Sequence, residues 1–252
     1  MRYMEPAERV FAEDFAAARH VTDSDGASYV VTPTGAWCRR IFIVGALTER
    51  RGRGDLMQAR VADPTGTFLV TAGRKNPDAV ETLGYIEPPA FVAVTGRATL
   101  RGSGPRAHAV VEAEALRVVD RTARDLWVQR TAGATLDRLE ALGRGLRGGG
   151  DERAVTTIGR YETTDADLRD MAGMVRMALE SAGPCDAIDI APITAPDLLL
   201  TALGDEGEIA VDDAVTLGVH SGLSAREARK ALEELLAAGE CYQPSSGTIK
   251  LI

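Results

Sequence analysis

The sequence predicts an α+β protein whose first half is mainly β and whose second half is α-helical. Between residues 37 and 120, apolar and polar residues alternate in five short runs, as they do in half-buried strands. From residue 164 onward, apolar residues recur about every 3.6 positions, as they do on one face of a helix. With 252 residues, 45% of them hydrophobic, the chain carries enough apolar material for two cores.

The first half has the element order of a small closed barrel. Residues 76–84 predict one short helix, because Asn76 suits the N-cap, Pro77 the first turn and Gly84 the end. This helix falls between the third and fourth strand-like runs. Three strands, a helix and two strands form the order of an OB-fold barrel, which we assign to residues 37–123. The five predicted strands are residues 37–49, 56–63, 66–72, 91–100 and 108–120.

The segment before the barrel, residues 1–36, is predicted to be an N-terminal helical extension. Its apolar residues between positions 6 and 19 are spaced to share one face of a short helix. The run Asp23–Gly26 resembles the start of a calcium-binding loop, but the third acidic ligand and the closing glutamate are missing, so no calcium site is predicted. The residues on the helical face are Val10, Phe11, Phe15 and Ala18.

A long helix is predicted directly after the barrel, over residues 124–143. Five of its residues alternate at spacings of four and three, which makes a narrow seam suited to another helix. We interpret it as an assembly helix that contacts another subunit, although packing of the seam on the chain's own barrel fits the pattern equally well. Residues 144–163 begin with a Gly-rich run that has no Walker pattern, so they are assigned as a linker. The predicted subunit-contact residues are Val128, Ala132, Thr135, Leu139 and Leu142.

The last part of the chain, residues 164–252, has the element order of a winged helix. Thr164 and Asp167 form a capping pair ahead of its first amphipathic helix, and Ser224 and Glu227 form a capping box ahead of its last one. After that first helix, three further helices and two strands joined by a turn predict a winged-helix domain. These five elements are residues 197–203, 212–217, 224–238, 240–244 and 248–252.

Charge is distributed unevenly along the chain, whose formal net charge is -8. Residues 37–125 contain 14 Lys and Arg against 10 Asp and Glu, whereas residues 151–252 contain 8 against 19. A weakly basic first half can neutralise phosphates. A strongly acidic second half repels a polyanion and favours basic protein surfaces. The two halves are therefore expected to have different partners.

Nucleic acid is the partner that the predicted barrel favours. OB folds bind single strands across their second and third strands, with phosphates on basic loops and bases stacked on aromatic rings. Residues 50–54 and 101–106 are basic and are expected to be the loops that flank this groove. Aromatic residues are few, and those within strands favour core packing. The candidate nucleic-acid-binding residues are Arg39, Arg40, Phe42, Arg50, Arg51, Arg53, Arg60, Phe68, Arg74, Lys75, Arg97 and Arg101.

Catalytic chemistry is not predicted. The three histidines, His20, His108 and His220, lie in different segments, and no HExxH, GxSxG or GxGxxG motif is present. The three cysteines, at positions 38, 185 and 241, form no CxxC pair, so neither a disulfide framework nor a zinc site is expected. We therefore expect no enzyme, no cofactor and no metal. No apolar run approaches the roughly 18 residues of a membrane span, and the acidic N-terminus is unlike a signal peptide, so a cytoplasmic protein is expected.

Five segments of the first half carry a likeness to known proteins, and the longest of them are residues 40–49 (RIFIVGALTE) and 59–68 (ARVADPTGTF). They resemble the archaeal replication protein A-associated family. The likeness covers residues 29–140, whereas the C-terminal likeness is one of architecture, to the winged helices that end the middle subunit of eukaryotic replication protein A and archaeal replicative helicases. At residues 71–74 the chain departs from strand-binding barrels, which often carry an aromatic residue there. The segments are residues 29–36 (YVVTPTGA), 40–49 (RIFIVGALTE), 59–68 (ARVADPTGTF), 91–96 (FVAVTG) and 124–128 (RDLWV).

The resemblance implies an accessory subunit of a replication protein A-like complex that binds single-stranded DNA. Beside a larger partner subunit, the barrel contacts DNA weakly by itself, and the acidic winged helix recruits replication and repair proteins. One alternative is a protein adaptor whose barrel binds no DNA. Another is a winged-helix transcription regulator, in which Arg226, Arg229 and Lys230 face duplex DNA.

Overall fold

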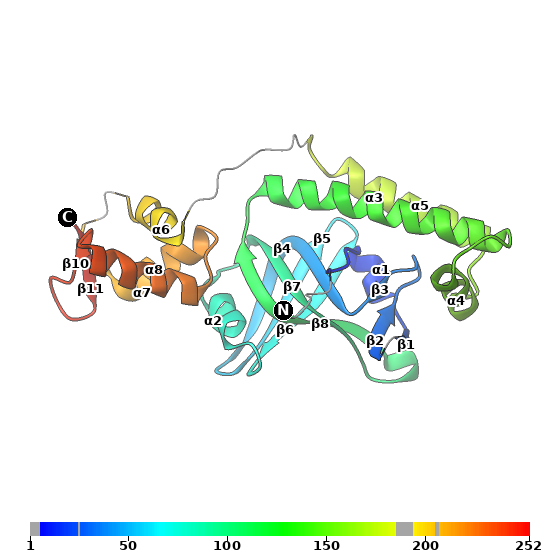
Figure 1. Ribbon diagram of the computed structural model, residues 1–252, viewed down its shortest axis with the longest axis horizontal. Helices are drawn as coiled ribbons and strands as arrows, with labels where there is room; N and C mark the ends of the chain where they lie inside the picture. The colour runs from blue at the N-terminus through cyan, green and yellow to red at the C-terminus, as the bar shows by residue number, and fades with distance from the viewer. Residues whose placement is uncertain (1–5, 25, 185–193, 205–206) are drawn as a thin grey trace.

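A closed barrel of five strands forms the centre of the chain, and helices lie along one side of it and at one end (Figure 1). The structure is a computed structural model that describes residues 6–24, 26–184, 194–204 and 207–252. Neighbouring strands follow the order β4-β5-β6-β8-β7, and all pairs are antiparallel except β6 with β8. The elements are β4 (Arg40–Arg53), β5 (Leu56–Asp63), β6 (Gly66–Gly73), α2 (Pro77–Tyr85), β7 (Ala90–Arg101) and β8 (His108–Val118).

This architecture confirms the predicted order of three strands, a helix and two strands, and it is consistent with an OB fold. Alternate residues of each strand point into the barrel, where Ile43, Val61, Phe68 and Val94 are fully buried. Because the inward positions are apolar, burial of this row fixes which residues face outward. The outward row of β5 and β6 is therefore set by the sequence once the strands are paired.

Two glycines allow barrel strands to approach one another closely. A Cβ at Gly45 would lie 2.3 Å from the carbonyl oxygen of Ala62, and a Cβ at Gly96 would lie 2.5 Å from that of Glu112. Only glycine fits at either position without displacing a neighbouring strand. At Gly96 the pairing of β7 with β8 also shifts register, which bends these strands around the barrel.

The two predicted basic loops differ from the prediction in structure. Residues 50–53 continue β4 and pair with β5, so that Arg50 lies opposite Ala59 and Arg51 opposite Gln58. Only Gly54 and Asp55 connect these two strands, and Gly54 has the positive φ of 63° that a tight hairpin requires. Arginines 50, 51 and 53 are thus on a rigid hairpin, where neighbours point to opposite faces. In the second region, the short 3-10 helix η1 (Gly104–Arg106) connects β7 to β8.

The N-terminal extension is only partly helical, so its prediction as a helical segment over residues 1–36 is wrong. The predicted apolar residues at positions 10, 11, 15 and 18 are all buried, but the helix is limited to α1 (Ala12–Ala16). Glu8 instead exchanges backbone hydrogen bonds with Arg40 and Phe42 of β4. A small antiparallel sheet follows, because β-branched residues favour strands there. It consists of β1 (His20–Ser24), β2 (Ala27–Val31) and β3 (Trp37–Cys38), so the predicted strand over residues 37–49 is divided between two sheets. Asp25 and residues 1–5 lie outside the described residues.

Three helices follow the barrel: α3 (Arg121–Leu146), α4 (Glu152–Tyr161) and α5 (Asp165–Glu180). Helix α5 lies alongside α3 (Figure 1). The predicted linker over residues 144–163 is wrong where α4 lies, because the side chain of Asp151 caps a helix there by accepting the Ala154 N–H at 2.8 Å. The predicted capping pair of Thr164 and Asp167 is confirmed, but it starts a helix that packs on α3. Helix α5 therefore belongs with the barrel, and the predicted domain boundary at residue 164 is wrong.

The C-terminal unit contains the three predicted helices and the two predicted strands. Its capping box is confirmed, since Ser224 accepts the Glu227 N–H at 3.2 Å and Glu227 accepts the Ser224 N–H at 3.0 Å. A further short strand, β9, joins the sheet, whose order is β10-β11-β9. The elements are α6 (Ala195–Leu203), β9 (Ile209–Ala210), α7 (Val211–His220), α8 (Ala225–Ala238), β10 (Cys241–Tyr242) and β11 (Thr248–Leu251).

This C-terminal unit contacts α2 of the barrel through the start of α8. The Ala225 N–H donates to Oγ1 of Thr82 at 3.0 Å, and the Arg226 N–H donates to a carboxylate oxygen of Asp78 at 3.1 Å. The guanidinium of Arg229 pairs with Glu81 at 2.5 Å. Residues of α2 therefore satisfy the first amide groups of α8, which a helix leaves without partners of its own.

Two further observations concern side chains and helices outside these contacts. Cys38 and Cys241 are buried free thiols, whereas Cys185 lies outside the described residues. None of the helices that the structure describes combines the length and apolar character needed to cross a membrane.

Candidate nucleic-acid interface

A groove lies on the outward face of β5 and β6, between the β4–β5 hairpin and the end of β7. It encloses a cavity of about 270 Å³. Strands β4, β5, β6 and β7 and the start of β8 contribute to its walls. Side chains from positions between 49 and 110 therefore meet there. The polar and charged lining residues are Glu49, Arg51, Gln58, Arg60, Thr71, Arg101 and His108, and Leu69 and Val110 supply apolar surface.

Strand register determines which side chains meet in this groove. Gln58 lies opposite Arg51 on one side and opposite Thr71 on the other, which makes one row across β4, β5 and β6. Residues that are directly opposite in antiparallel strands point to the same face of a sheet. Two residues along, Arg60 lies opposite Glu49 and Leu69, which makes the second row. The two rows form the floor of the groove.

The groove is basic, and its guanidinium groups are accessible. The side chains of Arg51, Arg60 and Arg101 are 78%, 56% and 44% exposed. Glu49 pairs with both Arg51 and Arg60, the latter at 3.1 Å, and Glu112 pairs with Arg101 at 3.0 Å. Exposed ion pairs of this kind contribute only about 0–1 kcal/mol each. A phosphate can therefore replace these carboxylates at little cost.

Base stacking has little support in the groove. Among the described residues that line the cavity, none is phenylalanine, tyrosine or tryptophan. The His108 ring and the planar guanidinium groups are the remaining surfaces on which a base can stack. One ring nitrogen of His108 lies 3.1 Å from the carbonyl oxygen of Arg106, which restrains the ring. The geometry therefore favours contacts to phosphates over contacts to bases.

Of the twelve residues predicted from the sequence to bind nucleic acid, the structure brings three together in this groove: Arg51, Arg60 and Arg101. Arg50 points elsewhere, because it pairs with Glu87 and donates to the Gly84 carbonyl at 2.9 Å. Arg74 pairs with Asp55 at 2.8 Å beside a different cavity, next to α2. The remaining cations of the prediction do not line the groove either: Arg39, Arg40, Arg53, Lys75 and Arg97.

The prediction that Phe68 stacks a base is wrong, and Phe42 lies outside the groove. Phe68 is fully buried in the barrel core and packs against Phe15, with ring centroids 5.9 Å apart. Phe42 lies beneath the guanidinium of Arg9, which is 5.3 Å from the ring centroid. Phe68 points into the barrel and Arg9 lies over Phe42, so neither ring lines the groove. Sequence reasoning in turn missed Gln58, Thr71 and His108, whose signal was their alternation with buried residues.

The predicted subunit-contact seam of α3 is covered by the chain itself. All five residues of the seam, at positions 128, 132, 135, 139 and 142, are buried within the described structure. Val128 and Ala132 belong to the core that includes the barrel. Leu139 and Leu142 instead pack in a cluster with Ala154 of α4 and apolar residues of α5. The structure therefore favours packing within the chain over contact with another subunit, because the barrel covers the start of the seam and α4 and α5 cover its end.

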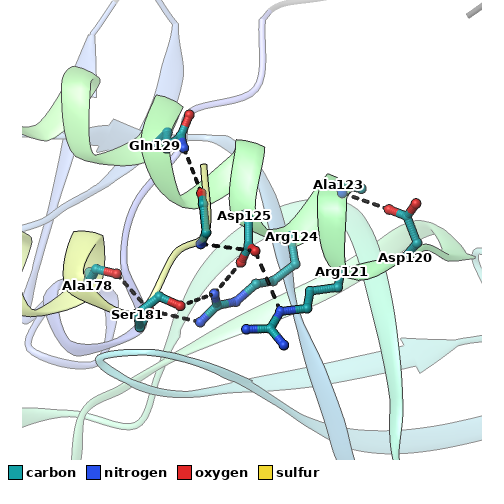
Figure 2. A network of polar contacts seen from close by, with 9 residues as sticks. Asp120, Arg121, Ala123, Arg124, Asp125, Gln129, Ala178 and Ser181 are labelled. Atoms are coloured by element: carbon teal, nitrogen blue, oxygen red, sulfur yellow. Dashed lines mark hydrogen bonds and ion pairs between the residues drawn. The ribbon is translucent and has the colours of Figure 1, made fainter. Parts of the chain in front are cut away.

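A buried polar network holds the start of α3 against the end of α5 (Figure 2). Arg124 pairs with Asp125 and donates to the carbonyl and hydroxyl oxygens of Ser181, each at 3.0 Å. Asp125 also accepts the Gly183 N–H at 3.2 Å. Burial raises the pKa of the Asp125 carboxyl, but the bonds from Arg124 and Gly183, with Arg121 nearby, together lower that pKa below its ordinary value of 3.8.

Replacing Asp125 with asparagine is expected to lower the free energy of unfolding at pH 7 by about 1.5–3 kcal/mol, because charged hydrogen bonds are lost. A lowered pKa stabilises the fold above the unfolded value, and this stabilisation is lost as the pH falls through the folded pKa. Urea denaturation of both proteins at pH 7 and near pH 3 measures the difference, which is expected to shrink in acid. A difference that stays constant with pH would contradict this role of the carboxylate.

Comparisons with known proteins were made for the whole chain. Neither a protein-family model nor a curated protein matches it. Among solved structures it is similar to a chain of a replication protein A heterotrimer bound to ssDNA, at 17% identity over 53% of this chain and 98% of that chain, with a TM-score of 0.41. It is also similar to a chain of the S. pombe Stn1-Ten1 complex, at 15% identity over 50% and 88%, with a TM-score of 0.41. These scores are below 0.5, so the proposal that follows depends on the groove itself.

Proposed function

We propose that this chain is a non-catalytic accessory subunit of a replication protein A-like complex, and that its groove binds single-stranded DNA weakly. The observation that carries the proposal is the convergence of Arg51, Arg60 and Arg101, from three different strands, on one groove. This groove lies across β5 and β6, the second and third strands of the barrel, which is where OB folds bind single strands.

The charges and the shape of the groove both support this proposal. A phosphate can take the place of the half-buried carboxylates that pair with the three exposed guanidinium groups. A single strand exposes phosphates and bases without the width of a duplex, so it fits a narrow groove between a hairpin and a strand end. Because the groove lacks aromatic rings among its described residues, binding to the isolated chain is expected to be weak.

The C-terminal unit completes the proposal. We assign it as a winged helix, from its three helices and three-stranded sheet. Residues 195–252, which make up this unit, contain 4 Lys and Arg against 10 Asp and Glu, so the unit repels DNA and is proposed to recruit replication and repair proteins through basic surfaces on them. Reading of duplex DNA by α8 is disfavoured, since Arg229 pairs with Glu81 of α2 and Lys230 with Glu234 of α8 itself.

The proposal is tested by fluorescence anisotropy of labelled oligo-dT and of a duplex control, titrated with the full chain. Single-strand preference is expected, and three phosphate contacts give a slope of roughly -2 for the logarithm of affinity against that of salt. Changing Arg51, Arg60 and Arg101 together to Glu is expected to weaken oligo-dT binding by about 10-fold or more. A large loss is expected because attraction becomes repulsion at three positions.

A matched control carries the same change of charge outside the groove, at Arg74, Lys75 and Arg176, whose side chains are exposed. This control is expected to weaken binding much less than the groove variant. Equal losses in both variants would show only a general effect of charge and would contradict the groove as the site. No binding of single strands at any salt concentration would favour the second candidate function, a protein adaptor, which the lack of aromatic lining also fits.

A further inference from the structure

A second basic cavity lies on the other side of β7, where β3, the start of β4 and α4 meet. It encloses about 210 Å³ and is lined by Tyr29, Trp37, Arg39, Arg40, Arg153 and Glu8, among others. Three guanidinium groups and one carboxylate line the cavity, and Arg40 also pairs with Glu114 at 2.8 Å; the remaining excess of positive charge favours an anion. The residues come from segments far apart in the chain, and only the packing of α4 against the N-terminal sheet brings them together.

Trp37 has an unsatisfied donor in this cavity wall. The side chain is only 7% exposed, and its indole N–H has no acceptor among the described residues. Trp37 also lines an adjoining cavity of about 300 Å³, so it separates two spaces that a ligand can enter. Buried donors in native proteins nearly always have a partner, so this one requires an explanation. The nitrogen itself is covered by protein atoms, so a ligand in the cavity contacts other groups of this wall.

The aromatic and cationic groups around Trp37 match a nucleotide. The guanidinium of Arg153 lies over the Trp37 ring, 5.1 Å from its centroid, and the Tyr29 ring lies 6.0 Å away. Arg153 makes no ion pair with a described residue. Cations that alternate with aromatic rings bind single strands without sequence preference, by contacting phosphates and stacking on bases. Tyr29 is partly exposed and supplies an aromatic surface that the groove described above lacks, whereas Trp37 is buried.

A row of outward residues connects the two sites across the barrel. Arg97 of β7 lies opposite Arg40 of β4 and opposite Glu112 of β8. Glu112 also pairs with Arg101, which lines the groove. Arg97 and Arg101 are four residues apart on one strand, which corresponds to roughly 13 Å. Arg97 is exposed and makes no ion pair within the described part of the chain, so it is available to a phosphate between the two sites.

We propose that single-stranded nucleic acid follows this path, from the groove over Arg97 to a second subsite at Trp37. There Arg153 and Arg39 contact a phosphate beside Trp37. This inference rests on the proposed function. It adds the direction in which the bound strand runs and the length of strand that the chain can hold. A short strand occupies the groove alone, whereas a longer strand reaches both sites and binds more tightly.

The test uses the full chain with oligo-dT of about 6 and about 18 nucleotides, lengths that span the usual site sizes of OB folds. The longer strand is expected to bind at least ~10-fold more tightly. The double variant Arg97→Glu, Arg153→Glu is expected to weaken binding of the longer strand at least ~10-fold and to leave the shorter one unchanged. Control variants Arg160→Glu and Arg176→Glu, combined, make the same change of charge at exposed positions of α4 and α5.

A second readout comes from Trp37 itself. The longer oligonucleotide is expected to quench tryptophan fluorescence, and this quenching is expected to be lost in Trp37→Phe, which keeps an aromatic ring but removes the N–H. Since the sequence has two tryptophans, the variant leaves Trp127 as an internal reference.

The outcomes separate this inference from the proposed function. If neither oligonucleotide binds, both are overturned. If the short strand binds but the double variant changes nothing, or weakens both lengths equally, only the path over Arg97 is overturned. Binding of poly-glutamate to the wild type, lost in the double variant while oligo-dT binding is retained, would make this cavity a peptide site and would also overturn the path.

Discussion

Replacing Trp127 with alanine is expected to lower the free energy of unfolding by about 3–5 kcal/mol, the usual cost of removing a large buried side chain. Trp127 lies on α3 and is 2% exposed. Its indole N–H donates to the carbonyl oxygen of Phe42 at 2.9 Å, and its ring meets Phe11 edge to face at 5.8 Å. One side chain thus links α3 to β4 and to the N-terminal segment.

The loss has two physical causes. Removal of the indole leaves a cavity between α3 and the barrel, and it leaves the buried Phe42 carbonyl without its donor. Urea denaturation of the wild type and the variant measures the change. Leu136→Ala is the control, because this side chain lies on the same helix and is 44% exposed, so a change within about 0.5 kcal/mol is expected. Similar effects of the two substitutions would contradict the role of Trp127 as the anchor of α3.

Replacing Ala225 with glutamate is expected to separate the C-terminal unit from the barrel. Ala225 is the first residue of α8 and is fully buried. A carboxylate there would be desolvated close to Asp78 and Glu81 of α2, whose partners are Arg226 and Arg229. Burial of an unpaired charge costs on the order of 3–5 kcal/mol, enough to shift the contact equilibrium more than about 100-fold. The first turn of a helix tolerates glutamate, so α8 itself is expected to fold.

Small-angle scattering and hydrogen exchange measure this separation. The radius of gyration is expected to rise, and the amides of α2 and of the first turn of α8 are expected to exchange faster, while helical circular dichroism is retained. Ala237→Glu introduces the same charge at an exposed position of α8 and is expected to change neither quantity. An unchanged radius of gyration and unchanged exchange in Ala225→Glu would contradict the contact between α8 and α2.

Local sequence patterns were sufficient to predict most of the elements. The runs over residues 56–63, 66–72 and 108–120 correspond to β5, β6 and β8, and residues 76–84 correspond to α2. The alternation of apolar and polar residues identifies the strands, and capping residues identify the helix ends. Both signals depend only on neighbours along the chain. The N-terminal sheet was missed because its strands have only two to five residues, too few to show a clear alternation, although all of its pairings are local.

Which arginines meet in one groove depends on the pairing of strands. The sequence identifies arginine as the common feature of the interface, but Arg50 and Arg51 are neighbours in sequence and point to opposite faces of one hairpin. Register and barrel closure then place Arg51 beside Arg60 and Arg101, and they direct Phe68 into the core. These are long-range pairings, and a shift of one residue would exchange the two faces.

The seam of α3 shows the same division. Its spacing of four and three residues specifies by itself that apolar surface must pack along α3, and another helix suits such a stripe. The spacing contains no information on whether that helix comes from another subunit or from the same chain. Tertiary structure decides this, since the barrel buries Val128 and Ala132, and α4 and α5 bury Leu139 and Leu142. The sequence thus determines which surfaces must be covered, and the three-dimensional path of the chain determines what covers them.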